Sequence, residues 1–169
     1  GPTRECLGNY LQSTATKDAS HTVQLDKPTN AVIWMDSVTI ICNSVPSDCL
    51  VAGEELSFKI NFQSRESLRS PRITFIISTV PDVPLINASN RYQPSRDFPV
   101  SVSEGTIYCN LGPVPFMEGS YTVSFWMGDE RQDWHAAENA LAFKVFGNDV
   151  WGTGQLPKSN SAYFWHPTV

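Results

Sequence analysis

The chain has 169 residues, with 12 basic and 17 acidic side chains, and charged residues make up only 17% of it. A chain of this length can bury a hydrophobic core without disulfides or metals, so we expect one soluble domain. The net charge of -5 leaves no basic footprint, which excludes a nucleic acid as partner. No stretch of the sequence approaches the roughly 20 apolar residues that a bilayer-spanning helix needs.

The first 31 residues have a different character from the rest of the chain. They are rich in Ser, Thr, Lys, Asp and Gln and show no sustained apolar period. We therefore expect residues 1–31 to be a linker or a loosely attached arm. The leading Gly1-Pro2 is typical of the remnant left by a tag-removing protease, so we expect that a targeting segment or a preceding domain was cut away.

From residue 32 onward, short β-rich runs recur between turn clusters, and this pattern predicts an all-β fold. We expect an immunoglobulin-like or jelly-roll antiparallel β-sandwich over residues 32–148. The stretch 133–141 has a helical look but could equally be a loop or the lead-in to a strand. The predicted strands are 32–42, 56–62, 72–80, 85–89, 98–102, 105–111, 120–127 and 141–146.

The last segment, residues 149–169, is rich in aromatic side chains, among them Trp151, Tyr163 and Trp165. Such a tail is unlike a free solvated end, so we expect it to pack on the domain or on a second copy. Exchange of a terminal strand between two copies is a low-cost route to a homodimer.

The cysteines and histidines do not form a metal motif. None of the four cysteines makes a Cys-x-x-Cys pair and the three histidines are scattered, so we expect no metal and no cofactor. Cys42 and Cys49 could form a disulfide in an oxidising compartment, or they could be unpaired thiols of a cytoplasmic protein.

The sequence contains no nucleophile or phosphate-loop motif, so we predict that the chain is not an enzyme. Asp129 and Asp133 could serve a glycosidase, which needs two carboxylates across a cleft. They fall in a predicted loop, where acidic residues are usually just solvated.

Strand alternation places two aromatic rings on outward faces. If Tyr121 and Phe125 point into the core, Trp126 points out of it, and inward Cys109 likewise leaves Tyr108 outward. These rings are either covered by the tail or by a second copy, or they form a platform on which sugars stack.

Polar residues at alternate strand positions, and others in predicted loops at the rim, would supply hydrogen bonds to such a sugar. No residue is a candidate for catalysis or metal binding. The candidate carbohydrate-binding residues are Trp126, Tyr108, Arg72, Thr74, Ser124, Trp134, His135, Arg91 and Tyr92.

An ordered set of motifs runs through the chain, and its most specific parts are Gly119-Ser120-Tyr121-Thr122-Val123-Ser124 and Phe143-Lys144-Val145-Phe146, followed by a glycine-rich segment. Over residues 34–166 the set resembles the C-terminal carbohydrate-binding domain of Wzt, the nucleotide-binding subunit of ABC transporters that export O-antigen polysaccharide.

This resemblance implies a β-sandwich, usually a homodimer, that recognises the terminus of a lipid-linked O-polysaccharide. It also implies a cytoplasmic location at the inner face of the inner membrane, where a preceding ATP-binding domain connects this domain to the transporter membrane subunit. Residues 1–31 would then be the end of the interdomain linker. Sugar chemistry differs between members, so no contact residue carries over by motif. The alternative is a secreted immunoglobulin-like adhesion domain, with a Cys42–Cys49 disulfide and a glycan on Asn87.

Overall fold

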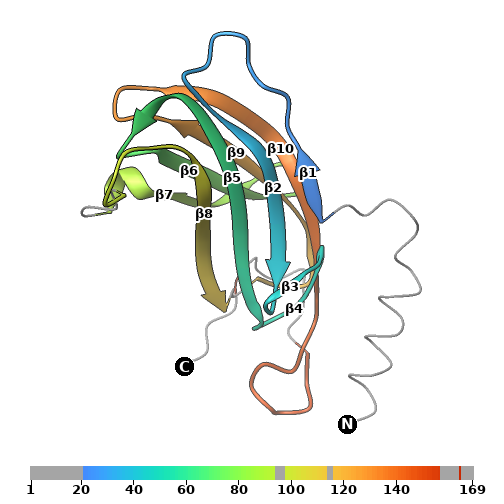
Figure 1. Cartoon of the computed structure of the whole chain (residues 1–169). Helices are drawn as coiled ribbons and strands as arrows, with labels where there is room; N and C mark the ends of the chain where they lie inside the picture. Colours follow the sequence, from blue (N-terminus) through green and yellow to red (C-terminus); the bar gives the residue numbers. More distant parts are fainter. Residues whose placement is uncertain (1–20, 94–97, 114–115, 157–163, 165–169) are drawn as a thin grey trace.

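The computed structural model describes residues 21–93, 98–113, 116–156 and 164, and these form two curved sheets packed face to face (Figure 1). Strands account for nearly all the regular structure, with a single short 3-10 helix, η1, at Asn90–Tyr92. The all-β sandwich predicted from the sequence is therefore confirmed.

The first sheet has the strand order β1-β2-β5-β8, and β3 pairs with the C-terminal end of β2. All its pairings are antiparallel. Its members are β1 (Thr22–Gln24), β2 (Ile33–Cys42), β3 (Val45–Pro46), β5 (Glu55–Leu68) and β8 (Val102–Pro113).

The second sheet has the order β4-β10-β9-β6-β7, and its β4–β10 pairing is parallel while the others are antiparallel. The end strands β7 and β8 lie on the same side of the sandwich (Figure 1). The members of this sheet are β4 (Cys49–Val51), β6 (Arg72–Thr79), β7 (Pro84–Ser89), β9 (Gly119–Gly128) and β10 (Asp133–Phe146).

Two segments differ from the sequence-based expectation, and a third, residues 133–141, follows the strand alternative that the sequence left open. Strand β1 lies inside the predicted arm, and its Val23 packs against the core. The predicted strand 98–102 is wrong, because β8 begins only at Val102. Residues 133–141 belong to β10, which pairs with β9 and takes up its extra residues in an irregularity between Ala137 and Leu141. Asn139 in that irregularity has φ +49°, which asparagine tolerates better than most residues.

The core is organised around three phenylalanines that meet between the sheets. Phe58 of β5 packs edge-on against Phe75 of β6 and Phe125 of β9, with ring centroids 5.3 and 5.4 Å apart. Such edge-to-face pairs add about 0.5–1.5 kcal/mol beyond the area they bury. They also fix the register, because a slip of one residue in any of these strands would turn its phenylalanine outward.

Tyr121 of β9 anchors the entry into its own strand. Its hydroxyl donates a buried hydrogen bond of 2.6 Å to the carbonyl of Met117, and its ring stacks on Phe116 at 4.9 Å. Phe164, the described residue of the segment 157–169, forms an isolated antiparallel bridge with Phe116. The rest of that segment, on which strand exchange was predicted, lies outside the described residues.

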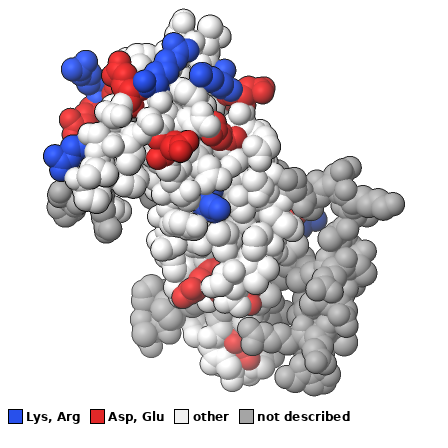
Figure 2. All heavy atoms as spheres, viewed as in Figure 1, with Lys and Arg blue, Asp and Glu red and all other residues white. Residues whose placement is uncertain are grey.

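Charged side chains are unevenly distributed over the surface. Figure 2 shows Lys, Arg, Asp and Glu gathered at the end of the sandwich that carries the β9–β10 turn, and few of them on the strands below. Within the described part of the chain, no helix is long and apolar enough to cross a bilayer.

Substitution of Phe125 and of its neighbour Trp126 tests the register of β9. Phe125 is fully buried whereas Trp126 is half-buried and points away from the core. We expect Phe125→Ala to lower the free energy of unfolding by about 3–5 kcal/mol, measured by chemical denaturation. Trp126→Ala is the matched control and should cost far less, and a larger loss for Trp126→Ala than for Phe125→Ala would contradict the register.

Candidate functional site

The outer face of the β10-β9-β6-β7 layer carries a cross-strand row of four side chains. The strand register aligns Ala136 with Trp126, Trp126 with Thr74, and Thr74 with Ser89. Residues directly opposite each other in a sheet lie on the same face, with Cβ atoms about 4.5–5.5 Å apart. Trp126 is thus the large aromatic group in a row of otherwise small side chains.

The neighbouring row on this face runs through Ser124, Ile76 and Asn87, which the register also aligns across β9, β6 and β7. These side chains are small or slender, so they do not build a wall against the Trp126 ring. The result is a flat aromatic surface with hydroxyl and amide groups beside it and no charged group in these two rows. We call these two rows the Trp126 face.

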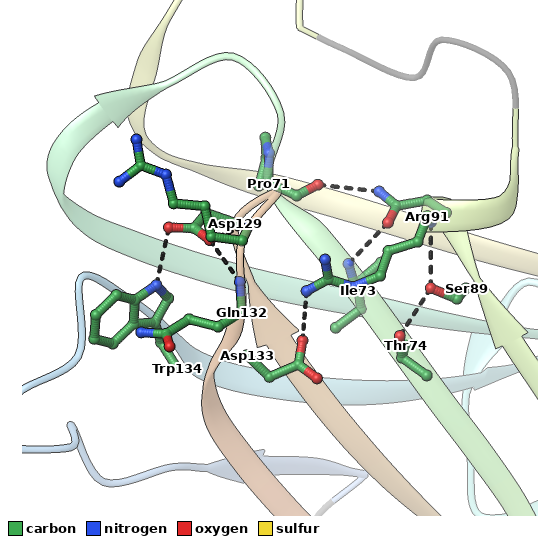
Figure 3. A network of polar contacts seen from close by, with 11 residues as sticks. Pro71, Ile73, Thr74, Ser89, Arg91, Asp129, Gln132, Asp133 and Trp134 are labelled. Atoms are coloured by element: carbon green, nitrogen blue, oxygen red, sulfur yellow. Dashed lines mark hydrogen bonds and ion pairs between the residues drawn. The ribbon is translucent and has the colours of Figure 1, made fainter.

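Two ion pairs lie at the end of the Trp126 face. Arg72 of β6 contacts Glu130 at 3.2 Å. Arg91 of η1 contacts Asp133 of β10 at 2.6 Å, as Figure 3 shows. Glu130 and Asp133 are well exposed, so each pair contributes little to stability, on the order of 0–1 kcal/mol. Each guanidinium is held at the rim beside its carboxylate.

The hydroxyl groups of the Trp126 face also support the sheet. The Thr74 hydroxyl donates to the Ser89 hydroxyl oxygen at 2.8 Å, and that oxygen accepts from the backbone N–H of Arg91 (Figure 3). Ser124 accepts a 2.8 Å hydrogen bond from the backbone N–H of Asn139, in the irregular part of β10. These contacts orient the side chains. Thr74 and Ser124 keep acceptor lone pairs for a ligand, whereas both lone pairs of the buried Ser89 hydroxyl are used within the protein.

Tyr108 does not join the other candidates. It is 59% exposed but lies on β8, where its register partner is Lys59 of β5, so it occupies the outer face of the other sheet. The prediction that Tyr108 and Trp126 share one face is wrong, because sequence alternation gives the side of a strand but not the sheet that the strand joins.

Tyr92 is 85% exposed on η1, next to Arg91.

Trp134 is not a loop residue as predicted, because it lies in β10 and packs against the core. Its indole N–H donates to the Asp129 carboxylate at 3.0 Å (Figure 3). Partial burial alone would raise the pKa of Asp129, but the hydrogen bonds from Trp134 and from the backbone N–H groups of Gln132 and Arg131 outweigh it and lower the pKa. Asp129 is thus an ionised anchor of the β9–β10 turn.

Gly128 leads into that turn, and the close approach of the chain explains why a glycine stands there. A Cβ atom at this position would lie 2.0 Å from the Gln132 carbonyl oxygen. Any larger residue would open the turn and move the Asp129 anchor.

His135 is also wrongly predicted as a rim residue, because it is buried in β10 with only 8% of its surface exposed. Its Nδ1 accepts a 3.0 Å hydrogen bond from the backbone N–H of Met35 in the facing sheet. Burial lowers the pKa of His135 below its ordinary value of 6.5. The residue therefore links the two sheets as a neutral imidazole.

The three described cysteines, Cys42, Cys49 and Cys109, are free thiols. The Cys42 thiol donates to the carbonyl of Ser47 at 3.0 Å, so the structure lends no support to the disulfide of the adhesion-domain alternative. The described residues include no group of three or more His, Cys, Asp and Glu side chains that could hold a metal ion.

Sequence reasoning missed six residues of this site: Ala136, Ile76, Asn87, Ser89, Glu130 and Asp133. The first four lie on the Trp126 face because of cross-strand register, which cannot be seen in a single sequence. Asn87 stood out only as a match to the glycosylation pattern. The Asp133–Arg91 pair joins residues 42 positions apart, and no local signal indicates it.

Comparison with known proteins identifies the fold. A family model described as the Wzt C-terminal domain matches residues 33–156. The crystal structure of the C-terminal domain of Wzt is similar, with a TM-score of 0.61 and 11% identity over 92% of this chain and 95% of that chain. A search of curated proteins gives no significant match.

Two further structures show weaker likeness. A Niemann-Pick type C2 protein from Japanese carpenter ant has a TM-score of 0.47 and 12% identity over 72% of this chain and 99% of that chain. A β-glucosidase from Listeria innocua in complex with glucose has a TM-score of 0.40 and 14% identity over 79% of this chain but 20% of that chain. The structural likeness to the Wzt domain thus supports the sandwich fold.

The buried His135 makes the stability of the domain depend on pH. Below 6.5 the unfolded chain binds a proton on this imidazole and the folded chain does not, so stability falls as the pH drops from 6.5 toward the lowered folded pKa. We expect the free energy of unfolding to decrease over this window, and His135→Gln to flatten the decrease. Equal slopes for both proteins in urea titrations across this range would contradict the assignment.

Proposed function

Because the chain belongs to the Wzt C-terminal domain family, we propose that it is a non-catalytic domain that binds the terminus of an O-antigen polysaccharide through the Trp126 face. The observation that carries the proposal is the outward Trp126 ring between small side chains on four neighbouring strands. Apolar faces of sugar rings stack on flat aromatic side chains, and small neighbours leave room for them.

The polar groups around Trp126 suit the hydroxyl groups of an uncharged sugar. Thr74 and Ser124 are the polar neighbours of Trp126, and Asn87 lies farther along the same face on β7. The guanidinium groups of Arg72 and Arg91 lie at the rim beside their carboxylates. Hydrogen bonds to charged donors are stronger than neutral ones, so the rim would hold a terminal residue in one orientation. Tyr92, exposed beside Arg91, would extend the rim to a second sugar unit.

The proposed partners follow from the family and not from any contact described above. The domain would act as part of a polysaccharide ABC transporter, at the cytoplasmic face of the inner membrane. The part of residues 1–31 that precedes β1 would link it to the ATP-binding domain of the transporter. Association of two copies through residues 149–169 would place two glycan sites in one assembly. Two weak sites gain affinity through effective concentration when one polymer reaches both.

Replacement of one outward aromatic residue on each sheet by alanine tests which face binds the glycan. We expect Trp126→Ala to abolish binding of the matched O-polysaccharide in calorimetric titration, because the stacking surface is lost. Tyr108→Ala is the matched control, since it removes an exposed ring from the opposite sheet and should retain binding. The reverse result would move the site to the outer face of β8 and β5.

An unmatched O-polysaccharide is the specificity control for the same titration. The unchanged protein should bind the matched polymer and not the unmatched one. Absence of binding to either polymer would contradict the proposed function itself, whichever face is considered.

A further inference from the structure

A cavity of about 650 Å³ lies between the two sheets, at the side where β7 and β8 end them. Its volume is within the roughly 300–1,000 Å³ of ordinary small-molecule sites. The walls come from the inward side chains of β6 and β7 on one sheet and of β8 on the other. The apolar lining residues are Pro71, Ile73, Phe75, Ile86, Ala88, Phe98, Ile107, Cys109, Leu111 and Pro113.

The cavity exists because the inward residues at this side are too small to fill the space between the sheets. Phe58, Phe75 and Phe125 close the centre of the sandwich, but Ala88 of β7 and Cys109 of β8 stand in the outer positions. The β8 residues Ile107, Cys109 and Leu111 remain only half-buried for the same reason. Apolar surface is thus left open to a ligand inside the domain.

Among the described residues, no charged side chain and no histidine lines the cavity. Three polar lining residues are already engaged by the protein: Ser89 with Thr74, Asn90 with the backbone of Pro71 and Ile73, and Thr106 with Asn61. Both the amide oxygen and the amide nitrogen of Asn90 are used in this way (Figure 3). The remaining polar lining residues, Gln93, Tyr108 and Asn110, are exposed and lie toward solvent.

Burial keeps the one titratable group on the apolar wall neutral, because it raises the pKa of the Cys109 thiol to about 12. Away from the exposed Gln93, Tyr108 and Asn110, the described lining therefore carries no charge, and its polar side chains are already hydrogen-bonded within the protein. A sugar buried here would lose the hydration of its hydroxyls without replacement, which is costly. An apolar ligand meets no such cost, and cavities of this kind bind apolar molecules.

We propose that this cavity binds a single uncharged aliphatic chain that enters between β7 and β8. The chain would pack along Ile86 and Ala88 on one side and Ile107 and Leu111 on the other. A polar end of the ligand would remain at the mouth, near Asn110 and Gln93. This inference is independent of the proposed glycan function, because the cavity lies inside the sandwich whereas the Trp126 face is the outer surface of its sheet.

The direct test uses the unchanged protein and the uncharged fluorescent probe N-phenyl-1-naphthylamine, whose emission rises in apolar surroundings. We expect saturable binding of one probe per chain. Linear alcohols below their solubility limit should displace it, with affinity rising with chain length, whereas glucose and maltose should not. Absence of saturable binding, or displacement by the sugars alone, would overturn the proposal.

Two phenylalanine substitutions on β7 locate the bound probe. Ala88 points into the cavity and its neighbour Asn87 points away from it, so Ala88→Phe fills the space and Asn87→Phe is the matched control. We expect Ala88→Phe to weaken probe binding by about tenfold or more, and Asn87→Phe to leave it unchanged. Equal affinity of the two folded variants would overturn the location.

Thermal melting establishes that each variant is folded, and Cys109→Leu is a milder filling substitution on the opposite wall that should weaken binding in the same direction. Trp126→Ala separates the two proposals, because it should retain probe binding while losing the glycan. Loss of probe binding in Trp126→Ala with melting unchanged would place the probe on the outer face and overturn the cavity site.

Discussion

The contact of Phe58 with Phe75 and Phe125 fixes which side chains of β5, β6 and β9 face the core and which face outward. These rings join the central strands of the two sheets, and each belongs to a strand whose side chains alternate between faces. Once Phe125 is inside, Trp126 must be outside, and once Phe75 is inside, Thr74 and Ile76 must share the outer face with Trp126. The surface proposed for glycan binding is therefore a geometric consequence of core packing.

The three rings also determine which part of the core is densely packed. Aromatic rings fill the middle of the sandwich, whereas alanine, cysteine and isoleucine stand near its open side, and the sheets enclose the cavity between β7 and β8. One sheet thus presents two chemically different surfaces. Its outer side combines an aromatic ring with polar neighbours, and its inner side offers apolar walls whose polar neighbours are already paired within the protein.

The residues with unusual electrostatics serve the scaffold. His135 accepts the Met35 N–H across the sheets and is kept neutral by burial, and Asp129 is ionised because the β9–β10 turn donates to it. Considered alone, their shifted pKa values would suggest catalytic roles. Each has a structural partner or burial that accounts for its pKa shift.

The sequence by itself determined the class of fold, most strand positions and the outward direction of Trp126, because apolar alternation within a strand is a local property. It also carried the family resemblance. Only the tertiary structure decided that Tyr108 lies on the other sheet, that His135 is buried and that Ala136 and Asn87 lie on the Trp126 face. Those facts depend on which strands pair and in which register, and pairing joins residues far apart in the chain. The cavity was hidden for the same reason, since it arises where small side chains of two separate sheets happen to face each other.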